Sequence, residues 1–332
     1  MNQCMHAPKT GFLRALMALA CALTGLLPQA AGAVYPEQPI TMIVAYAPGG
    51  GTDLVARAIA PYIEKYLGDG ARVLVVNRAG AGGEIGYAAL ASAPRDGYTI
   101  GFINSPPVLT IPIERKSAFN WNNLDLLANV VDDPGNFSVN ADSPFKNLAD
   151  LAAFAKANPN AVSVGTTGSG TSPHLGMVLF EKIAGVKMNH IPFKGSSEVR
   201  TALAGKQIVV GAINIGEALQ YAKSGTPMRN LGQMSQVRSV LAPELATFKE
   251  QGFDIELTSL RGLAAPKGLP AAIRERLVVA VERAVADPAF QAQAAKFYSP
   301  VRFLPPAKYE AELREAETQF RKLWSETPWI DK

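Results

Sequence analysis

The hydrophobic pattern of the chain first becomes regular near residue 40. Residues 40–47 (ITMIVAYA) are almost all apolar, as in a buried strand, and the run breaks at Pro48 and three glycines. A segment with apolar residues at helical spacing follows, and Thr52 and Asp53 stand where a helix N-cap is expected. Glycines let the backbone approach a ligand closely, and the first N–H groups of a helix lack intrahelical partners. This stretch therefore predicts a site for a carboxylate or phosphate, although glycine-rich turns also occur without any ligand.

The same pattern returns about 120 residues later. Residues 162–166 (VSVGT) predict a second strand, and residues 167–174 (TGSGTSPH) form a loop rich in glycine and hydroxyl side chains. Apolar positions 175, 178, 179 and 183 then recur at helical spacing. The chain thus carries two copies of one local device, a strand followed by a glycine loop and a helix start.

The remaining pattern predicts alternating strands and helices. Further strands are expected at 72–76, 98–103, 124–131, 188–192, 207–213, 228–234 and 255–263, and helices at 85–93, 150–158, 198–204, 214–225, 243–251, 271–286, 288–297 and 307–325. This alternation predicts a largely parallel sheet covered on both faces by helices. Ligands of such sheets bind beyond the carboxyl ends of the strands, where Asn104 and Ser105 also lie.

The first 33 residues have the pattern of a secretory signal peptide. Lys9 and Arg14 precede an apolar stretch at 15–27, and Ala31-Gly32-Ala33 has the form of a cleavage site. The stretch is short for a membrane span, and lipidation at Cys21 would call for a leucine where Ala18 stands. We expect cleavage after Ala33 and export of a soluble chain.

Composition excludes several classes of chemistry. The 332 residues, 48% hydrophobic and 18% charged, suit a globular protein of two domains. The net charge of +4 comes without a basic cluster, so we expect no nucleic-acid partner. Cys4 and Cys21 are the only cysteines and both lie in the leader, so the exported chain has no disulfide.

Catalytic motifs are likewise missing. There is no HExxH motif, no Lys-Ser or Lys-Thr after either glycine loop, and no Gly-x-Ser-x-Gly. His174 stands where a structural role is the more common one, and Asp53 stands where a capping role is. We therefore predict no metal, no cofactor and no catalytic activity. Lys194 and Arg261 are basic residues in expected loops that could reach a ligand or remain solvated, and Tyr46 could line the site.

Taken together, these motifs resemble the receptors of tripartite tricarboxylate transporters, the Bug family of periplasmic proteins. The resemblance covers essentially the whole exported chain. It is carried, in order, by YAPGGGTD at 46–53, NRAGAGG at 77–83, DGYT at 96–99, GSGT at 168–171, PFKGS at 192–196, PELATF at 243–248 and RGLAAP at 261–266. The chain departs from the family pattern in two places. It has Ser259-Leu260-Arg261 where many members carry a tryptophan just before the glycine of the Arg261-Gly262 motif, and Phe193 replaces the common tyrosine.

The resemblance implies a type II periplasmic binding fold, with two α/β domains that have mixed sheets around a ligand cleft and are joined by two strand crossovers. It assigns 34–133 plus 255–332 to the first domain and 134–254 to the second, after the signal peptide at 1–33. It implies capture of a small organic carboxylate, aromatic or aliphatic, by a periplasmic monomer that delivers it to membrane permease subunits. The expected ligand-binding residues are Tyr46, Pro48, Gly50, Gly51, Thr52, Asp53, Ser105, Thr166, Thr167, Gly168, Ser169, Gly170, Thr171, His174, Lys194 and Arg261.

Two other functions share this cleft. A membrane sensor, rather than a permease, could read the ligand-bound form. A secreted hydrolase could use Ser169 or Ser172 with His174, although no spacing in the sequence favours it.

Overall fold

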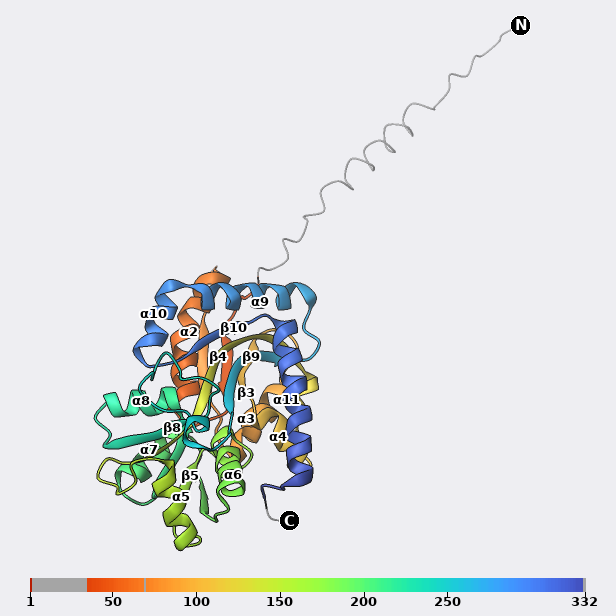
Figure 1. The fold of residues 1–332 in the computed structure, drawn as a ribbon. Helices are drawn as coiled ribbons and strands as arrows, with labels where there is room; N and C mark the ends of the chain where they lie inside the picture. Colours follow the sequence, from red (N-terminus) through yellow and green to blue (C-terminus); the bar gives the residue numbers. More distant parts are fainter. Residues whose placement is uncertain (2–34, 69, 331–332) are drawn as a thin grey trace. The chain divides into compact units, whose positions relative to one another are not determined.

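The computed structural model describes residue 1 and residues 35–68 and 70–330 (Figure 1). The predicted signal peptide, Met1 apart, and its cleavage site at Ala33 lie outside the described residues. Residues from Gln38 onwards form one compact unit, and the description below concerns this unit.

The first part of the fold is built on three parallel strands. β1 (Ile40–Val44) lies between β2 (Val73–Asn77) and β3 (Thr99–Asn104), as their apolar runs predict. Helices α2 (Gly51–Leu67), α3 (Glu84–Ala91) and α4 (Pro107–Glu114) pack around these strands. The sequence thus places the first glycine loop between the buried strand β1 and the helix α2.

Two long antiparallel strands connect the two parts of the sheet. β4 (Leu124–Asn140) pairs with β9 (Thr258–Pro266) along its first residues and with β7 (Val210–Asn214) and β8 (Met228–Gln233) along its last. β9 also pairs with β3. The whole path runs β2-β1-β3-β9-β4-β7-β5-β6, with β8 and β10 attached to β4.

The second part repeats the parallel arrangement of the first. β5 (Ser163–Thr166) lies between β6 (Asn189–Pro192) and β7, parallel to both. The helices here are α5 (Leu148–Ala157), α6 (Ser172–Ala184), α7 (Ser196–Ala204) and α8 (Ile215–Lys223). In Figure 1 α5, α6, α7 and β5 lie at the lower end of the ribbon, below β3.

The C-terminal segment returns to the first part. Its elements are α9 (Ala271–Ala286), α10 (Pro288–Lys296), β10 (Val301–Leu304) and α11 (Pro306–Glu326). α9 packs against α2, and α11 packs against α4 and β4. In the part of the chain that the structure describes, no helix has the length and apolarity needed to cross a membrane.

The structure corrects several predicted elements. β4 continues past residue 131 to Asn140, because β9 and β7 pair with its later residues. The sequence pattern did not predict α4, which begins at Pro107, where proline fits the first turn of a helix, and contains Pro112 further along. The helix predicted at 243–251 is wrong: only Lys249–Gln251 is helical, as a 3-10 turn. The Gln233 side chain donates to the carbonyls of Ala242 and Leu245, which a helix would use internally.

Candidate functional site

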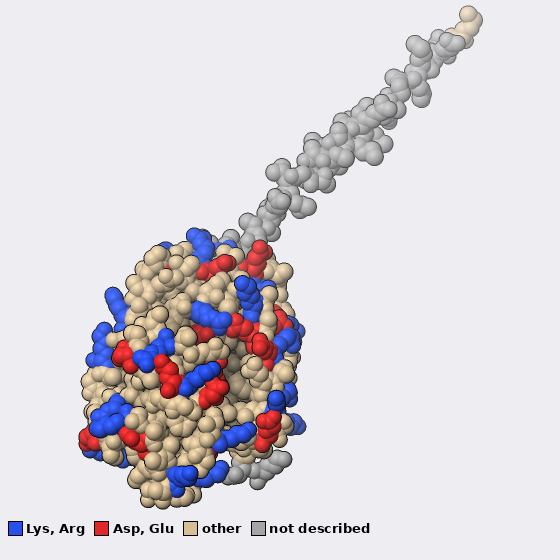
Figure 2. Space-filling model, in the orientation of Figure 1, with Lys and Arg blue, Asp and Glu red and all other residues tan. Residues whose placement is uncertain are grey.

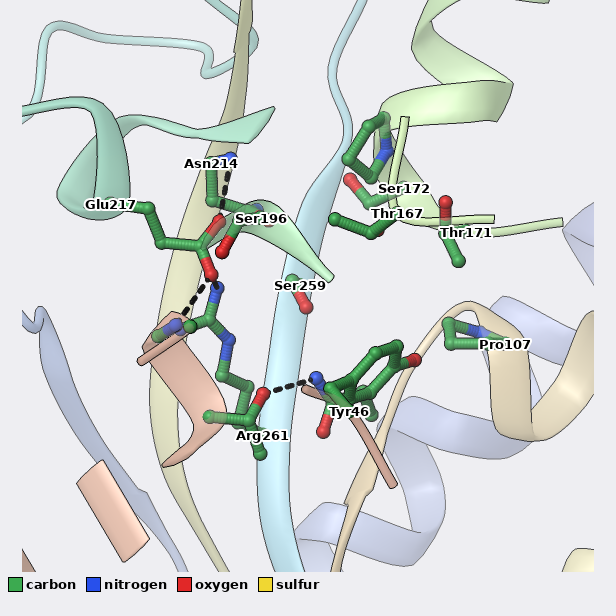
Figure 3. A pocket seen from close by; sticks show the side chains of 15 residues that line it. Tyr46, Pro107, Thr167, Thr171, Ser172, Ser196, Asn214, Glu217, Ser259 and Arg261 are labelled. Carbon is green, nitrogen blue, oxygen red and sulfur yellow. Dashed lines mark hydrogen bonds and ion pairs between the residues drawn. The ribbon is translucent and has the colours of Figure 1, made fainter. Parts of the chain in front are cut away.

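A small pocket lies where the carboxyl ends of β1, β3, β5 and β7 meet (Figure 3). Its cavity measures about 30 Å³. The residues that line it are Tyr46, Gly50, Gly51, Thr52, Asn104, Pro107, Thr167, Thr171, Ser172, Pro173, Ser196, Asn214, Glu217, Ser259 and Arg261. They come from both parts of the sheet, so the pocket exists only when these two parts face each other.

Four helices begin at this pocket. Gly51, Ser172 and Ser196 are the first residues of α2, α6 and α7, and Asn214 immediately precedes α8. Each helix start carries a partial positive charge and N–H groups without intrahelical partners. The convergence of four such ends makes the pocket suited to an anion.

A buried ion cluster forms one wall of the pocket. Arg261, on β9, is 3% exposed; its Nη2 lies 3.2 Å from Asp133 Oδ2 and 3.3 Å from Glu217 Oε1. Asp133 is 1% exposed and Glu217 is 7% exposed, and they come from β4 and α8. The guanidinium charge is therefore already compensated by carboxylates of the chain itself.

Both carboxylates also accept backbone hydrogen bonds at helix starts. Gly51 N donates to Glu217 Oε1 at 2.8 Å, Asn214 N donates to Glu217 Oε2 at 3.2 Å, and Gly216 N donates to Asp133 Oδ1 at 3.0 Å. In Figure 3 Glu217 sits between Asn214 and Arg261, with its carboxylate turned toward both. Glu217 thus ties the start of α2 to the start of α8.

Burial shifts the titration of this cluster. It raises the pKa of Asp133 to about 7, although the Arg261 guanidinium acts in the opposite direction. For Arg261, burial alone would lower the pKa, but Glu217 and Asp133 hold it above its usual value. The guanidinium is therefore a permanent cation, and Asp133 is the group of the cluster that titrates near neutrality.

Three buried polar atoms at the pocket have no hydrogen-bond partner among the described residues. They are Asn104 Oδ1, Ser172 Oγ and Arg261 Nε. Asn104 is 6% exposed and Ser172 is 2% exposed. Asn104 Nδ2 donates to Thr52 Oγ1 at 2.9 Å, which fixes the amide beside the start of α2. A buried polar group without a partner costs free energy, so these atoms are ready to bond a ligand.

The first glycine loop is held by the second part of the fold. Tyr221 Oη donates to Gly49 O at 3.0 Å, and Ser197 Oγ donates to Pro48 O at 3.0 Å. Ala47 N donates to Lys194 O at 3.3 Å. These bonds come from α7, α8 and the turn before α7, so the loop carrying Gly50 depends on contacts with distant residues.

The second loop is held by the first part in return. Thr110 Oγ1, on α4, donates to Gly170 O at 2.7 Å. A Cβ placed on Gly82 would lie 3.0 Å from Ser169 O, so the two glycine-rich segments touch. Each part of the fold therefore holds the glycine-rich loop of the other part in place by direct contacts.

The structure brings together seven of the residues that the sequence proposed as ligands. Those at the pocket are Tyr46, Gly50, Gly51, Thr52, Thr167, Thr171 and Arg261. The Tyr46 hydroxyl lies 3.1 Å from Tyr87 Oη, and burial raises its pKa. The Tyr46 side chain therefore stays uncharged and forms part of the pocket wall. Thr171 Oγ1 donates to Gly168 O at 2.6 Å, which leaves the hydroxyl engaged within its own loop.

The other proposed ligands lie outside the lining of this pocket. They are Pro48, Asp53, Ser105, Thr166, Gly168, Ser169, Gly170, His174 and Lys194. Asp53 accepts from Gly49 N at 2.9 Å and pairs with Arg57 at 2.9 Å, and these bonds lower its pKa despite burial. The predicted N-cap at Thr52 or Asp53 is wrong, because Gly50 caps a helix that begins at Gly51. A role for these nine residues in ligand binding stays a prediction.

His174 supports the second loop. Its ring stacks on His190 with centroids 3.8 Å apart, and its Nδ1 accepts from Gly170 N at 3.0 Å. His190 Nε2 lies 2.7 Å from Thr166 Oγ1. Burial lowers the pKa of His174 to about 3, helped by His190, and the pKa of His190 to about 4. Both rings are therefore neutral at physiological pH and act as packing and hydrogen-bonding groups.

Eight lining residues are absent from the expected ligand-binding residues. They are Asn104, Pro107, Ser172, Pro173, Ser196, Asn214, Glu217 and Ser259. The rule for strand ends did place Asn104, which ends β3, at the expected edge of the sheet, and it applies equally to Asn214, which ends β7. Glu217 gives only the weak signal of an acidic residue in a first helical turn. No local pattern marks Ser259.

Comparison with known proteins agrees with this architecture. The model of the tripartite tricarboxylate transporter family receptor matches residues 55–303. The chain belongs to this receptor family. The UPF0065 protein in the gbd 5′ region of Cupriavidus necator is 36% identical over 290 residues, 86% of each chain.

Solved structures confirm the predicted type II periplasmic binding fold. The periplasmic binding protein BugD has a TM-score of 0.82 at 30% identity, over 88% of this chain and 98% of that chain. MatC from Rhodopseudomonas palustris, solved with bound malate, has a TM-score of 0.81 at 23% identity, over 87% and 99% of the two chains. At this identity the likeness to MatC concerns the fold. The position of the hinge and the domain boundaries stay predictions.

Proposed function

We propose that this family member is a periplasmic receptor that captures a small organic carboxylate in the pocket between β1–α2 and β5–α6. The observation that carries the proposal is the convergence of four helix starts on one buried pocket that also holds unpartnered polar atoms. Neutral donors can share the charge of a carboxylate without a metal. Among the described residues, no group of three His, Cys, Asp or Glu side chains could hold a metal ion.

The size of the cavity argues for movement on binding. A cavity of about 30 Å³ leaves room for only a few atoms. A ligand of several carbon atoms must therefore enter while the two parts of the sheet stand apart. We propose that β4 and β9, which cross between these parts, bend to open the pocket. The ligand then stabilises the closed form by its difference in affinity for the two forms.

Membrane permease subunits of a tripartite tricarboxylate transporter are the proposed partners. Family membership supports this assignment, and the signal-peptide pattern of the first 33 residues supports a periplasmic location. On the face drawn in Figure 2, acidic and basic side chains are interspersed over the described residues. This mixture suits a soluble receptor better than a nucleic-acid surface.

The hydrolase alternative finds no support in the position of His174. A serine nucleophile would need the histidine ring as its base. His174 Nδ1 instead accepts the Gly170 backbone N–H, and Ser172 Oγ has no partner in the described chain. The sensor alternative concerns the membrane partner, and the proposed ligand site is the same.

A thermal-shift screen tests the proposed function. Protein purified after export is unfolded and refolded to remove bound ligand, and is then melted with mono-, di- and tricarboxylates and with their neutral amides. A ligand at 100 times its dissociation constant adds about 2.7 kcal/mol of stability, which a melting curve resolves. Stabilisation by carboxylates but not by the fully neutral amides is expected. No shift with any carboxylate would refute the proposal.

A further inference from the structure

The start of α2 already holds a carboxylate, and it belongs to the protein. Glu217 Oε1 accepts the Gly51 N–H at 2.8 Å and lies 3.3 Å from Arg261 Nη2, while Oε2 accepts the Asn214 N–H at 3.2 Å. A Cβ added to Gly51 would lie 2.5 Å from this oxygen, so the carboxylate rests directly on the helix end. Glu217 therefore occupies the place that a ligand anion would take at α2.

The charge at this end of the pocket discourages a second anion. Arg261 is compensated by Glu217 and by Asp133, and all three side chains are buried. Glu217 is the one acidic residue among the described residues that line the pocket. A ligand carboxylate beside it would meet a like charge at short range in a poorly screened site.

The start of α6 is an anion site that Glu217 does not fill. Ser172 begins a helix of 13 residues, and its Oγ is buried, lines the pocket and has no partner in the described chain. In Figure 3 Ser172, Thr167 and Thr171 stand across the pocket from Glu217 and Arg261. The hydroxyl and the first-turn N–H of Ser172 are the donors that a carboxylate would find there.

The α2 end offers both an unpartnered acceptor and an unpartnered donor, Arg261 Nε, whereas the α6 end offers donors. Asn104 Nδ2 donates to Thr52 Oγ1, so Oδ1 is the free atom of the amide, and it has no partner among the residues described. An acceptor next to a buried carboxylate calls for a hydrogen-bond donor on the ligand.

We propose that the pocket selects a small carboxylate whose opposite end carries a hydrogen-bond donor, such as an amide, in place of a second carboxylate. Glu217 is the residue that sets this selectivity. The ligand carboxylate binds at Ser172 and the start of α6, and the donor end faces Asn104 and Glu217. The inference rests on the proposed function of carboxylate capture, and it narrows the ligand class of the same site.

Matched ligand pairs test this selectivity. Succinate and succinamate have nearly the same shape and differ by one charge, as do glutarate and glutaramate. Dissociation constants are measured by titration calorimetry on refolded wild-type protein and on the variant Glu217→Gln. The control is Glu198→Gln, because Glu198 also lies in a first helical turn and accepts a backbone N–H, from Lys194 at 3.0 Å, but does not line the pocket.

We expect the wild type to bind the half-amide at least tenfold more tightly than the dicarboxylate. Glu217→Gln should reduce this ratio at least tenfold, mainly by strengthening the dicarboxylate, and Glu198→Gln should leave it unchanged. A wild-type preference for the dicarboxylate would overturn the inference, and this test does not require any variant to fold. If the ligands bind but Glu217→Gln does not alter the ratio of their dissociation constants, the role of Glu217 is overturned and carboxylate capture is left intact. If no carboxylate binds, both proposals fail.

Discussion

The two glycine loops begin as the same local device and end in different chemistry. Each follows a buried parallel strand, each leads into a helix, and each helix start faces the pocket. At α2 the Gly51 N–H is bonded to Glu217, a residue 166 positions away in the chain. At α6 the Ser172 hydroxyl has no partner in the described part of the protein. A helix start is therefore only a potential anion site, and distant residues decide whether a ligand can use it.

The loops also differ in what supports them. The first is supported by a charged cluster in which one guanidinium pairs with two carboxyl groups. The second is supported by the stacked rings of His174 and His190 and by the Thr110 hydroxyl, and the buried Glu114 carboxyl group also lies against its Gly170. Substitutions and changes of pH distinguish these two kinds of support.

Removing the cation of the first loop should have the largest effect. Arg261→Met leaves Asp133 and Glu217 buried without their partner, which costs about 3–5 kcal/mol of unfolding free energy. Arg302→Met is the control, because Arg302 pairs with Asp132 and Glu312 with a side chain that is 44% exposed, and exposed pairs contribute about 1 kcal/mol or less. Urea unfolding measures both. Equal losses of unfolding free energy for the two variants would show that the buried cluster stabilises the fold no more than an exposed ion pair does.

Acid should weaken the support of the second loop. The folded-state pKa values of His174 and His190, about 3 and about 4, lie below the usual 6.5. The unfolded chain therefore binds more protons below pH 6.5, and stability falls as the pH drops from 6.5 toward 4, by up to about 1.4 kcal/mol per pH unit for each ring. A His174→Asn/His190→Asn variant should lose less stability over this range. Equal losses of stability for wild type and variant between pH 6.5 and pH 4 would contradict the lowered pKa values of His174 and His190.

The stability that Asp133 contributes near the first loop should change with pH in the opposite direction. The pKa of Asp133 is raised from 3.8 to about 7, so the folded state binds the extra proton between these values. The contribution of Asp133 to stability is thus complete below pH 3.8 and is lost as the pH rises through 7. Relative to Asp133→Asn, the wild type should become less stable over this rise, as followed by urea unfolding.

Crowding the start of α2 should have an intermediate effect. The Cβ of Gly51→Ala would overlap Arg261 Nη1 and press on Glu217, and overpacking of this kind costs about 1–3 kcal/mol. Helix propensity alone predicts the opposite sign, because alanine is favoured over glycine by about 1 kcal/mol. Gly50→Ala is the control, since its nearest neighbour would be Ser196 Oγ at 3.1 Å. A higher melting temperature for Gly51→Ala would mean that Glu217 does not rest on this helix end.

Removing the Ser172 hydroxyl at the start of α6 should weaken ligand binding without destabilising the protein. Ser172→Ala deletes a charge-assisted bond to the ligand carboxylate, worth about 1.5 kcal/mol at the lower end of the usual range, or roughly tenfold in affinity. Its melting temperature without ligand should stay unchanged, because the hydroxyl has no partner in the described chain. Ser92→Ala is the control in calorimetric titration, because Ser92 is exposed, bonds Ala88 O and does not line the pocket. Equal affinities for Ser172→Ala and wild type would remove α6 from the carboxylate site.

Sequence patterns predicted the elements best where the pattern is local. α9 occupies the predicted residues 271–286, because its periodicity is uninterrupted. α4 was missed because two prolines suggested a turn, and β10 was missed because four residues between helices carry little pattern. The helix expected at 243–251 does not form, because the Gln233 side chain, on β8, bonds carbonyl groups that such a helix would use. No local pattern reveals these bonds.

Part of the candidate site could be predicted from local sequence in the same way. Gly50, Gly51 and Thr52 at one loop and Thr167 and Thr171 at the other stand out because the strand, loop and helix signals are contiguous in sequence. Arg261 was proposed as a basic residue that could reach a ligand; it lies in β9, within the strand expected at 255–263, and pairs with β3 and β4. Glu217 was not proposed, since its partner Gly51, at the start of α2, is 166 positions away in the chain.

The sequence by itself determined the two glycine loops, most of the alternating strands and helices, and the family to which the chain belongs. These features depend on the local spacing of apolar residues, glycines and hydroxyl side chains. The tertiary structure was needed to show that Glu217 fills the start of α2 and that the Ser172 hydroxyl at the start of α6 has no partner among the described residues. The physical reason is that this difference depends on side chains brought together by the pairing of β4 with both parts of the sheet, and strand pairing is a long-range property.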